Sequence, residues 1–156
     1  MRPSDLPPLA LPTYDFEVRP SRRGRLILDP VRRQFVRLTP EEWVRQHLLR
    51  YLIDDKGCPA ALIAVEKGFT YQRLPRRADI VVHDRQGQAR LIVECKAPEV
   101  AVDQAVFDQV AGYNRVLRAD HLMISNGLTH YICHLDRHAS TYRFLDDLPA
   151  YDALIG

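Results

Sequence analysis

The sequence predicts an α/β (α+β) fold in which a helix, a meander of three antiparallel strands, a second helix and two further strands follow one another. Two observations predict this order. Two segments repeat apolar residues at the spacing of an amphipathic helix, and short apolar runs bounded by glycine or charged turns follow each of them. A chain of 156 residues, 46% hydrophobic and 27% charged, is long and apolar enough for one domain with a core.

The first 38 residues are expected to form an arm and a short hairpin ahead of the main domain. Residues 1–20 are proline-rich and show no hydrophobic periodicity, which indicates an extended arm. Residues 25–28 and 34–38 have the composition of two short strands, joined through Asp29-Pro30. Residues 39–156 then form the main domain, and the whole chain is expected to be a single globular unit.

The first helix of the main domain has a strong start signal. Thr39 suits the N-cap, Pro40 suits the first helical position, and Glu42 would close a capping box with Thr39. The apolar face that follows consists of Val44, Leu48, Tyr51 and Leu52, widened by Leu49 and Ile53. Gly57 and Pro59 are expected to end the helix.

Strands are expected at residues 62–67, 78–83, 90–96, 122–125 and 130–135. The turn at 84–89 makes the second and third of them an antiparallel hairpin, and their apolar centres indicate that both sheet faces are covered. A second amphipathic helix is expected from Val102 to Arg118, after the break at Pro98. Asn126-Gly127 is the turn between the last two strands.

The composition argues against a membrane-spanning or disulfide-rich secreted protein. No apolar run is long enough to cross a membrane, and the N-terminus lacks a signal-peptide pattern, so a cytoplasmic protein is expected. The three cysteines show no Cys-x-x-Cys spacing and are expected to be reduced. His130 and His134 would share a strand face, but no cysteine or carboxylate stands at ligand spacing, so we expect ordinary histidines instead of a zinc site.

Three charged residues stand out at the ends of the expected hairpin strands. A hairpin centred between Gln86 and Gly87 places Asp79 opposite Glu94, with Cβ atoms about 5 Å apart. Lys96 follows Glu94 by two residues and would project from the same face.

Facing carboxylates repel each other unless a cation lies between them. Mg²⁺ binds carboxylate oxygens and water, lowers the pKa of that water and steadies charge on a phosphoryl oxygen; Lys96 could orient or deprotonate the water or stabilise the developing anion. The alternative is a cross-strand ion pair at a sheet edge. Against it, Glu94 and Lys96 follow a wholly apolar run, where charges are costly.

Two runs resemble the bipartite signature of the PD-(D/E)XK nuclease superfamily: Arg77-Ala78-Asp79-Ile80-Val81-Val82, then Leu91-Ile92-Val93-Glu94-Cys95-Lys96-Ala97-Pro98. Residues 39–135 are more closely similar to the N-terminal nuclease domain of type I restriction-enzyme R subunits. This resemblance implies a restriction-endonuclease-like core, with a central mixed sheet flanked by helices. It also implies that Asp79, Glu94 and the backbone carbonyl of Cys95 bind Mg²⁺, with Mn²⁺ as a substitute, and that Lys96 serves the attacking water.

The resemblance suggests further site residues. Gln109 and Tyr113 match a Gln-x-x-x-Tyr pattern implicated in positioning DNA or the active centre, although Tyr113 could simply be core. Glu42 resembles a first-helix glutamate that some members direct at the metal, although its capping role already explains it. Glu66 could be a further acidic neighbour, if a hairpin centred near residues 71–73 places it opposite Asp79.

Arginines make the last group of candidates. Arg73, Arg76 and Arg77 precede Asp79 and suit bidentate contact with nucleic-acid phosphates, the alternative being a solvated basic surface. The net charge of +2 permits such contact without demanding it.

The resemblance implies a Mg²⁺-dependent endonuclease that hydrolyses DNA phosphodiester bonds, in restriction, phage defence or DNA processing. No helicase or translocase region follows the similar segment, so a stand-alone domain is expected. The rival interpretation is a non-catalytic nucleic-acid-binding or assembly module that keeps the nuclease fold. DNA is the expected partner, and a homodimer or a partner protein would supply duplex cleavage or specificity.

Overall fold

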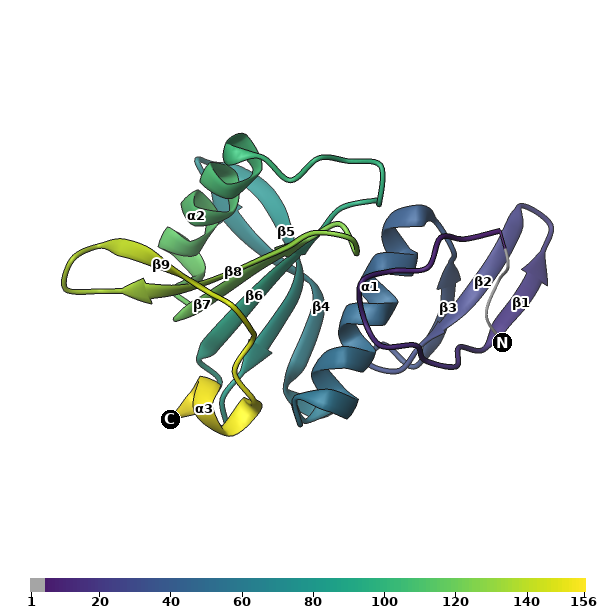
Figure 1. Cartoon of the computed structure of the whole chain (residues 1–156), viewed down its shortest axis with the longest axis horizontal. Coiled ribbons are helices and arrows are strands. Elements are labelled where there is room, and N and C mark those ends of the chain that lie inside the picture. Colours follow the sequence, from purple (N-terminus) through teal and green to yellow (C-terminus); the bar gives the residue numbers. More distant parts are fainter. Residues whose placement is uncertain (1–4) are drawn as a thin grey trace.

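The computed structural model describes residues 5–156 as two sheets with helix α1 between them (Figure 1). The smaller sheet consists of β1 (Val18–Ser21), β2 (Gly24–Asp29) and β3 (Gln34–Arg37). The larger sheet consists, in spatial order, of β4 (Ile63–Tyr71), β5 (Leu74–His83), β6 (Ala89–Cys95), β7 (His121–Ser125), β8 (His130–Asp136) and β9 (Thr141–Leu145). The α-helices are α1 (Pro40–Arg50), α2 (Gln104–Leu117) and α3 (Tyr151–Ile155).

The larger sheet confirms the predicted fold class. Strands β4, β5 and β6 form the antiparallel meander, and β7 returns parallel to β6 after the crossover through α2. Helix α2 covers one face of this sheet, where its Val110 packs with Val81 and Ile92. Helices α1 and α3 cover the other face, where Ile80 and Val93 are buried. The predicted burial of both faces is therefore confirmed.

The smaller sheet extends the predicted hairpin by one strand. Strands β2 and β3 match the expected pair, but β1 forms inside the segment that was expected to be an extended arm. The residues of β1 are largely exposed, so its sequence lacks the alternation of apolar and polar residues that indicates a half-buried strand. The sheet joins the body through an aromatic cluster in which Tyr14, Phe16 and Ile27 surround Trp43 of α1.

Helix α1 begins as predicted and continues past Arg50 as a π-helical turn over Tyr51–Asp55. The Thr39 hydroxyl accepts a hydrogen bond from the Glu42 N–H at 3.1 Å. The capping box also predicts a hydrogen bond from the Thr39 backbone N–H to the Glu42 carboxylate, and this part of the prediction is wrong. The Glu42 carboxylate accepts hydrogen bonds from Arg45 and Arg32 instead. Guanidinium groups are stronger partners for a buried carboxylate than a backbone N–H.

The C-terminal segment contains two elements that the sequence did not reveal. Strand β9 pairs antiparallel with β8, and α3 buries Tyr151 and Leu154 against the sheet. The Tyr151 hydroxyl also donates to the carbonyl of His83 at 3.0 Å.

The prediction of reduced cysteines agrees with the structure. Cys58, Cys95 and Cys133 are all free and buried. His130 uses Nδ1 in contact with the Ser125 hydroxyl and Nε2 in contact with the Ala10 carbonyl, so protein groups occupy both ring nitrogens.

Candidate active site

The strand register places the two predicted carboxylates next to each other. Ile80 lies opposite Val93, and Val81 lies opposite Ile92, which is the predicted register of β5 and β6. A bulge follows only beyond Val82, toward the turn, so it does not disturb the end of the hairpin that carries Asp79 and Glu94. Continued by one residue, this register places Asp79 opposite Glu94, and the charge of Asp79 raises the pKa of Glu94.

Backbone contacts fix the position of this pair. Asp79 Oδ2 accepts a hydrogen bond from the Cys95 N–H at 2.7 Å, so the two strands are joined at the site itself. Glu94 lies opposite Ile124 on β7, and the Lys96 N–H donates to the Ser125 carbonyl at 2.8 Å. The segment that carries Glu94 and Lys96 is therefore held between two neighbouring strands.

The site is largely buried but reachable. The side chain of Asp79 is 16% exposed and that of Glu94 is 12% exposed. The Lys96 ammonium lies 3.7 Å from Glu94 Oε1, and its side chain is 26% exposed. The Lys96 side chain therefore lies beside Glu94 and is also partly accessible to solvent.

Burial and mutual repulsion make full ionisation of the pair costly. Burial raises the pKa of Glu94, the Asp79 charge raises it further, and the Lys96 ammonium lowers it. Burial also raises the pKa of Asp79, against the lowering effects of the Cys95 N–H and the Arg45 guanidinium. A divalent cation between the carboxylates would remove this cost.

The donor set fits a hydrated Mg²⁺ ion better than a fully protein-ligated metal. Within residues 5–156, no group of three or more His, Cys, Asp and Glu residues is arranged to hold a metal ion. Mg²⁺ commonly uses one or two carboxylates and retains several waters, and Asp79 and Glu94 supply two. The backbone carbonyl of Cys95 is the further oxygen ligand that the sequence suggests. The contact that Cys95 makes with Asp79 in the structure is through its backbone N–H.

Glu42, the first-helix glutamate considered as a further metal ligand, is paired with arginines in the structure. The Glu42 carboxylate is occupied by the guanidinium groups of Arg45 and Arg32. Glu41 is the glutamate whose pKa is raised by burial and then by the charge of Asp79. The N-cap spacing identifies Glu42 as a candidate but does not report its arginine partners.

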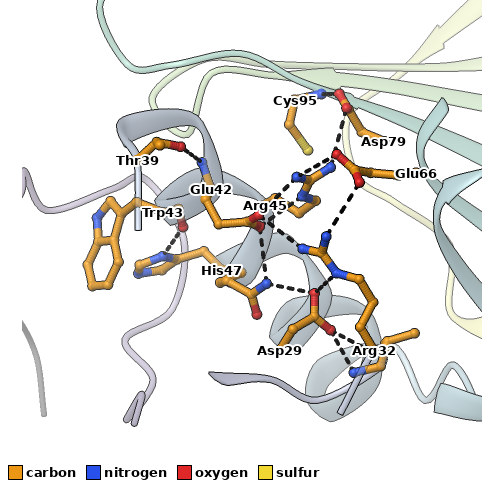
Figure 2. Close-up of polar contacts among 12 residues, drawn as sticks. Asp29, Arg32, Thr39, Glu42, Trp43, Arg45, His47, Glu66, Asp79 and Cys95 are labelled. Atoms are coloured by element: carbon orange, nitrogen blue, oxygen red, sulfur yellow. Dashed lines mark hydrogen bonds and ion pairs between the residues drawn. The ribbon is translucent and has the colours of Figure 1, made fainter. Parts of the chain in front are cut away.

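Glu66 lies where the expected second hairpin places it. The pairs Val65–Ile80 and Lys67–Ala78 flank it on β4, opposite Asp79. Its backbone adopts a left-handed conformation with φ of 54°. Its carboxylate lies 3.5 Å from both Arg45 and Arg32, so guanidinium groups neutralise it (Figure 2).

The Gln-x-x-x-Tyr pair forms one unit on α2. Gln109 Nε2 donates to the Tyr113 hydroxyl at 2.9 Å. The Tyr113 ring is buried and packs edge-on against Phe69 and Tyr71 of β4. Packing between α2 and β4 thus accounts for Tyr113, whereas Gln109 is exposed.

The predicted phosphate-binding arginines lie on the β4–β5 hairpin. Arg73 belongs to its tip and has a φ of 66°, and Arg76 and Arg77 follow on β5. All three are exposed. Arg77 lies 3.8 Å from Glu66 while its side chain remains 74% exposed, so the group stays available to a ligand.

Comparisons with known proteins bear on the family and the fold of the chain. The sequence profile of the family described as "Type I restriction enzyme R protein N terminus" matches residues 40–149. A solved fragment, described as an HsdR subunit of a type I restriction enzyme from Vibrio vulnificus YJ016, is similar with a TM-score of 0.56 and 20% identity. The similarity covers 76% of this chain and 25% of that one, and at this identity it shows the shared fold. No curated protein sequence matches the chain. Among residues 5–156, no helix is long and apolar enough to cross a membrane.

Proposed function

Because the chain belongs to the family of type I restriction enzyme R protein N termini, we propose that it is a Mg²⁺-dependent endonuclease domain that hydrolyses DNA phosphodiester bonds. The observation that carries this proposal is the Asp79–Glu94 pair, two adjacent and largely buried carboxylates with the Lys96 ammonium beside them. Such a pair is costly to keep in a fold, and it suits a site that binds a cation.

Each residue has a distinct role in this proposal. Asp79 and Glu94 would hold the ion, with the Cys95 carbonyl as a further oxygen ligand. A bound Mg²⁺ supplies a water of lowered pKa and neutralises charge on the phosphoryl group. Lys96 orients the attacking water and stabilises negative charge that develops on the phosphate. Arg73, Arg76 and Arg77 contact backbone phosphates of DNA, and exposed Gln109 helps to position it.

One observation favours a second candidate, a DNA-binding module without catalysis. Arg45 Nη1 already lies 3.5 Å from Asp79 Oδ1, so part of the charge that a metal would neutralise is balanced by the protein itself. In such a module the arginines of the β4–β5 hairpin would still bind DNA in a salt-dependent manner.

Cleavage of supercoiled plasmid tests the proposal through Lys96→Met. We expect the wild-type chain to nick plasmid in Mg²⁺ or Mn²⁺, and the variant to be slower by about a hundredfold, because it cannot stabilise charge on the phosphate. Lys56→Met is the matched control, since its ammonium pairs with Asp147 and should not affect the rate.

The products separate the two candidates. Equal rates for the wild type and Lys96→Met would contradict the assigned role of Lys96. DNA binding by the wild type without cleavage in either metal would favour the non-catalytic module. Because one centre cuts one strand, nicked circles should accumulate before linear plasmid unless a homodimer or a partner protein supplies a second centre.

A further inference from the structure

We propose that Arg45 is a positioning residue that fixes the Asp79 carboxylate for metal binding, and that the small N-terminal sheet holds Arg45 in place through Arg32. This inference rests on the proposed function in one respect, that Asp79 is a metal ligand. It goes beyond that function because it assigns part of the site to residues that precede the segment matched by the family profile, residues 40–149.

The guanidinium of Arg45 has a fixed orientation. Its side chain is 9% exposed, and it makes a bidentate pair with Glu42, with Nε at 2.8 Å from Oε2 and Nη2 at 2.9 Å from Oε1. A bidentate pair sets the plane of the guanidinium as well as its position. The remaining nitrogen, Nη1, points to Asp79 Oδ1 at 3.5 Å.

Glu42 is in turn held by the smaller sheet. Arg32, in the turn between β2 and β3, donates to Glu42 Oε1 at 3.0 Å and to Asp29 Oδ2 at 2.8 Å. Gln46 Nε2 donates to the same Asp29 oxygen at 2.9 Å and to Glu42 Oε2 at 3.2 Å. Asp29 is fully buried at the end of β2. Figure 2 shows the resulting chain of contacts, which runs from Asp29 through Arg32, Glu42 and Arg45 to Asp79.

These contacts leave Asp79 with a cationic or N–H neighbour at each oxygen. The Cys95 amide binds Oδ2, and the Arg45 guanidinium faces Oδ1. These two contacts restrain the orientation of the Asp79 carboxylate before any ligand binds. Because Glu42 engages two nitrogens of Arg45, the guanidinium is not free to swing onto a phosphate, which favours a positioning role over direct contact with substrate.

The test is metal affinity measured on the whole chain. Arg45→Lys keeps a positive charge beside Asp79 but loses the bidentate geometry, so a change in affinity reports positioning and not charge. We expect the dissociation constant for Mn²⁺, measured by calorimetry well below the unfolding temperature, to rise about tenfold, as for other groups that orient a metal ligand. Arg50→Lys is the matched control on the same helix, since Arg50 pairs with Asp54, and it should leave the affinity unchanged.

Other outcomes separate the alternatives. Arg32→Lys, one step further along the chain of contacts, should also weaken Mn²⁺ binding, and it decides the question if Arg45→Lys does not fold. Unchanged affinity in folded Arg45→Lys or Arg32→Lys, with only a lower unfolding temperature, would show a purely structural ion pair and overturn the inference alone. Absence of Mn²⁺ binding to the wild type would overturn the proposed function and this inference with it.

Discussion

Glu94→Gln should make the metal-free protein more stable while reducing DNA cleavage about a thousandfold. The folded state raises the pKa of Glu94 through burial and the charge of Asp79. A carboxyl whose pKa is raised on folding costs no stability well below its ordinary pKa; the cost grows as the pH rises from that ordinary value to the folded value and is constant above it. Glutamine removes the charge, so at pH 8 in EDTA we expect the free energy of unfolding to rise by about 1–2 kcal/mol.

Urea denaturation at pH 8 and pH 4 measures this effect, and plasmid nicking measures the loss of activity. The gain in stability should nearly vanish at pH 4, where Glu94 is mostly protonated in both states. Glu99→Gln is the control, because Glu99 is an exposed carboxylate in the segment that follows the site, and neither stability nor activity should change. A loss of stability in Glu94→Gln at pH 8 would contradict the assignment of a repulsive carboxylate pair.

Trp43→Ala should cause a large loss of stability, because it removes the bulkiest side chain of the core. The indole is fully buried, its ring lies 5.2 Å from Phe16 and 4.4 Å from His47 between centroids, and its N–H donates to the Pro7 carbonyl at 3.2 Å. Removing such a side chain leaves a cavity, and we expect the free energy of unfolding to fall by about 3–5 kcal/mol. For a chain of this size that corresponds to a decrease of roughly 10 °C in unfolding temperature.

Thermal and urea unfolding check this prediction, with Phe144→Ala as the control. The Phe144 side chain is an exposed hydrophobic at 61%, so its removal should change stability by no more than about 0.5 kcal/mol. A loss below about 1 kcal/mol in Trp43→Ala would show that the smaller sheet and α1 do not share a core.

The elements that the sequence predicts correctly are those with strong local signals. Helix α1 carries the Thr39-Pro40 start signal, and the turn between β5 and β6, with the apolar centres on either side of it, sets the register of that hairpin. That register is what brings Asp79 to Glu94. Strand β1 was missed because its side chains are exposed, and β9 because exposed residues such as Phe144 obscure its alternation.

The missed features of the site depend on contacts between distant segments. Arg32 meets Glu66 only after the smaller sheet has packed on α1, and no local pattern reports such a contact. The same packing brings Arg32 to Glu42. Spacing along a helix identifies which glutamates are candidates, but tertiary partners determine which one is engaged.

Titration of Mn²⁺ into the metal-free protein tests the central claim most directly, since it asks whether Asp79 and Glu94 bind a divalent cation. The wild type should show one site, observed by calorimetry and by loss of the free Mn²⁺ spectrum in electron paramagnetic resonance. The Asp79→Asn/Glu94→Gln double variant should lose that site while keeping its fold by circular dichroism. Binding of the same stoichiometry and affinity in the double variant would contradict the account.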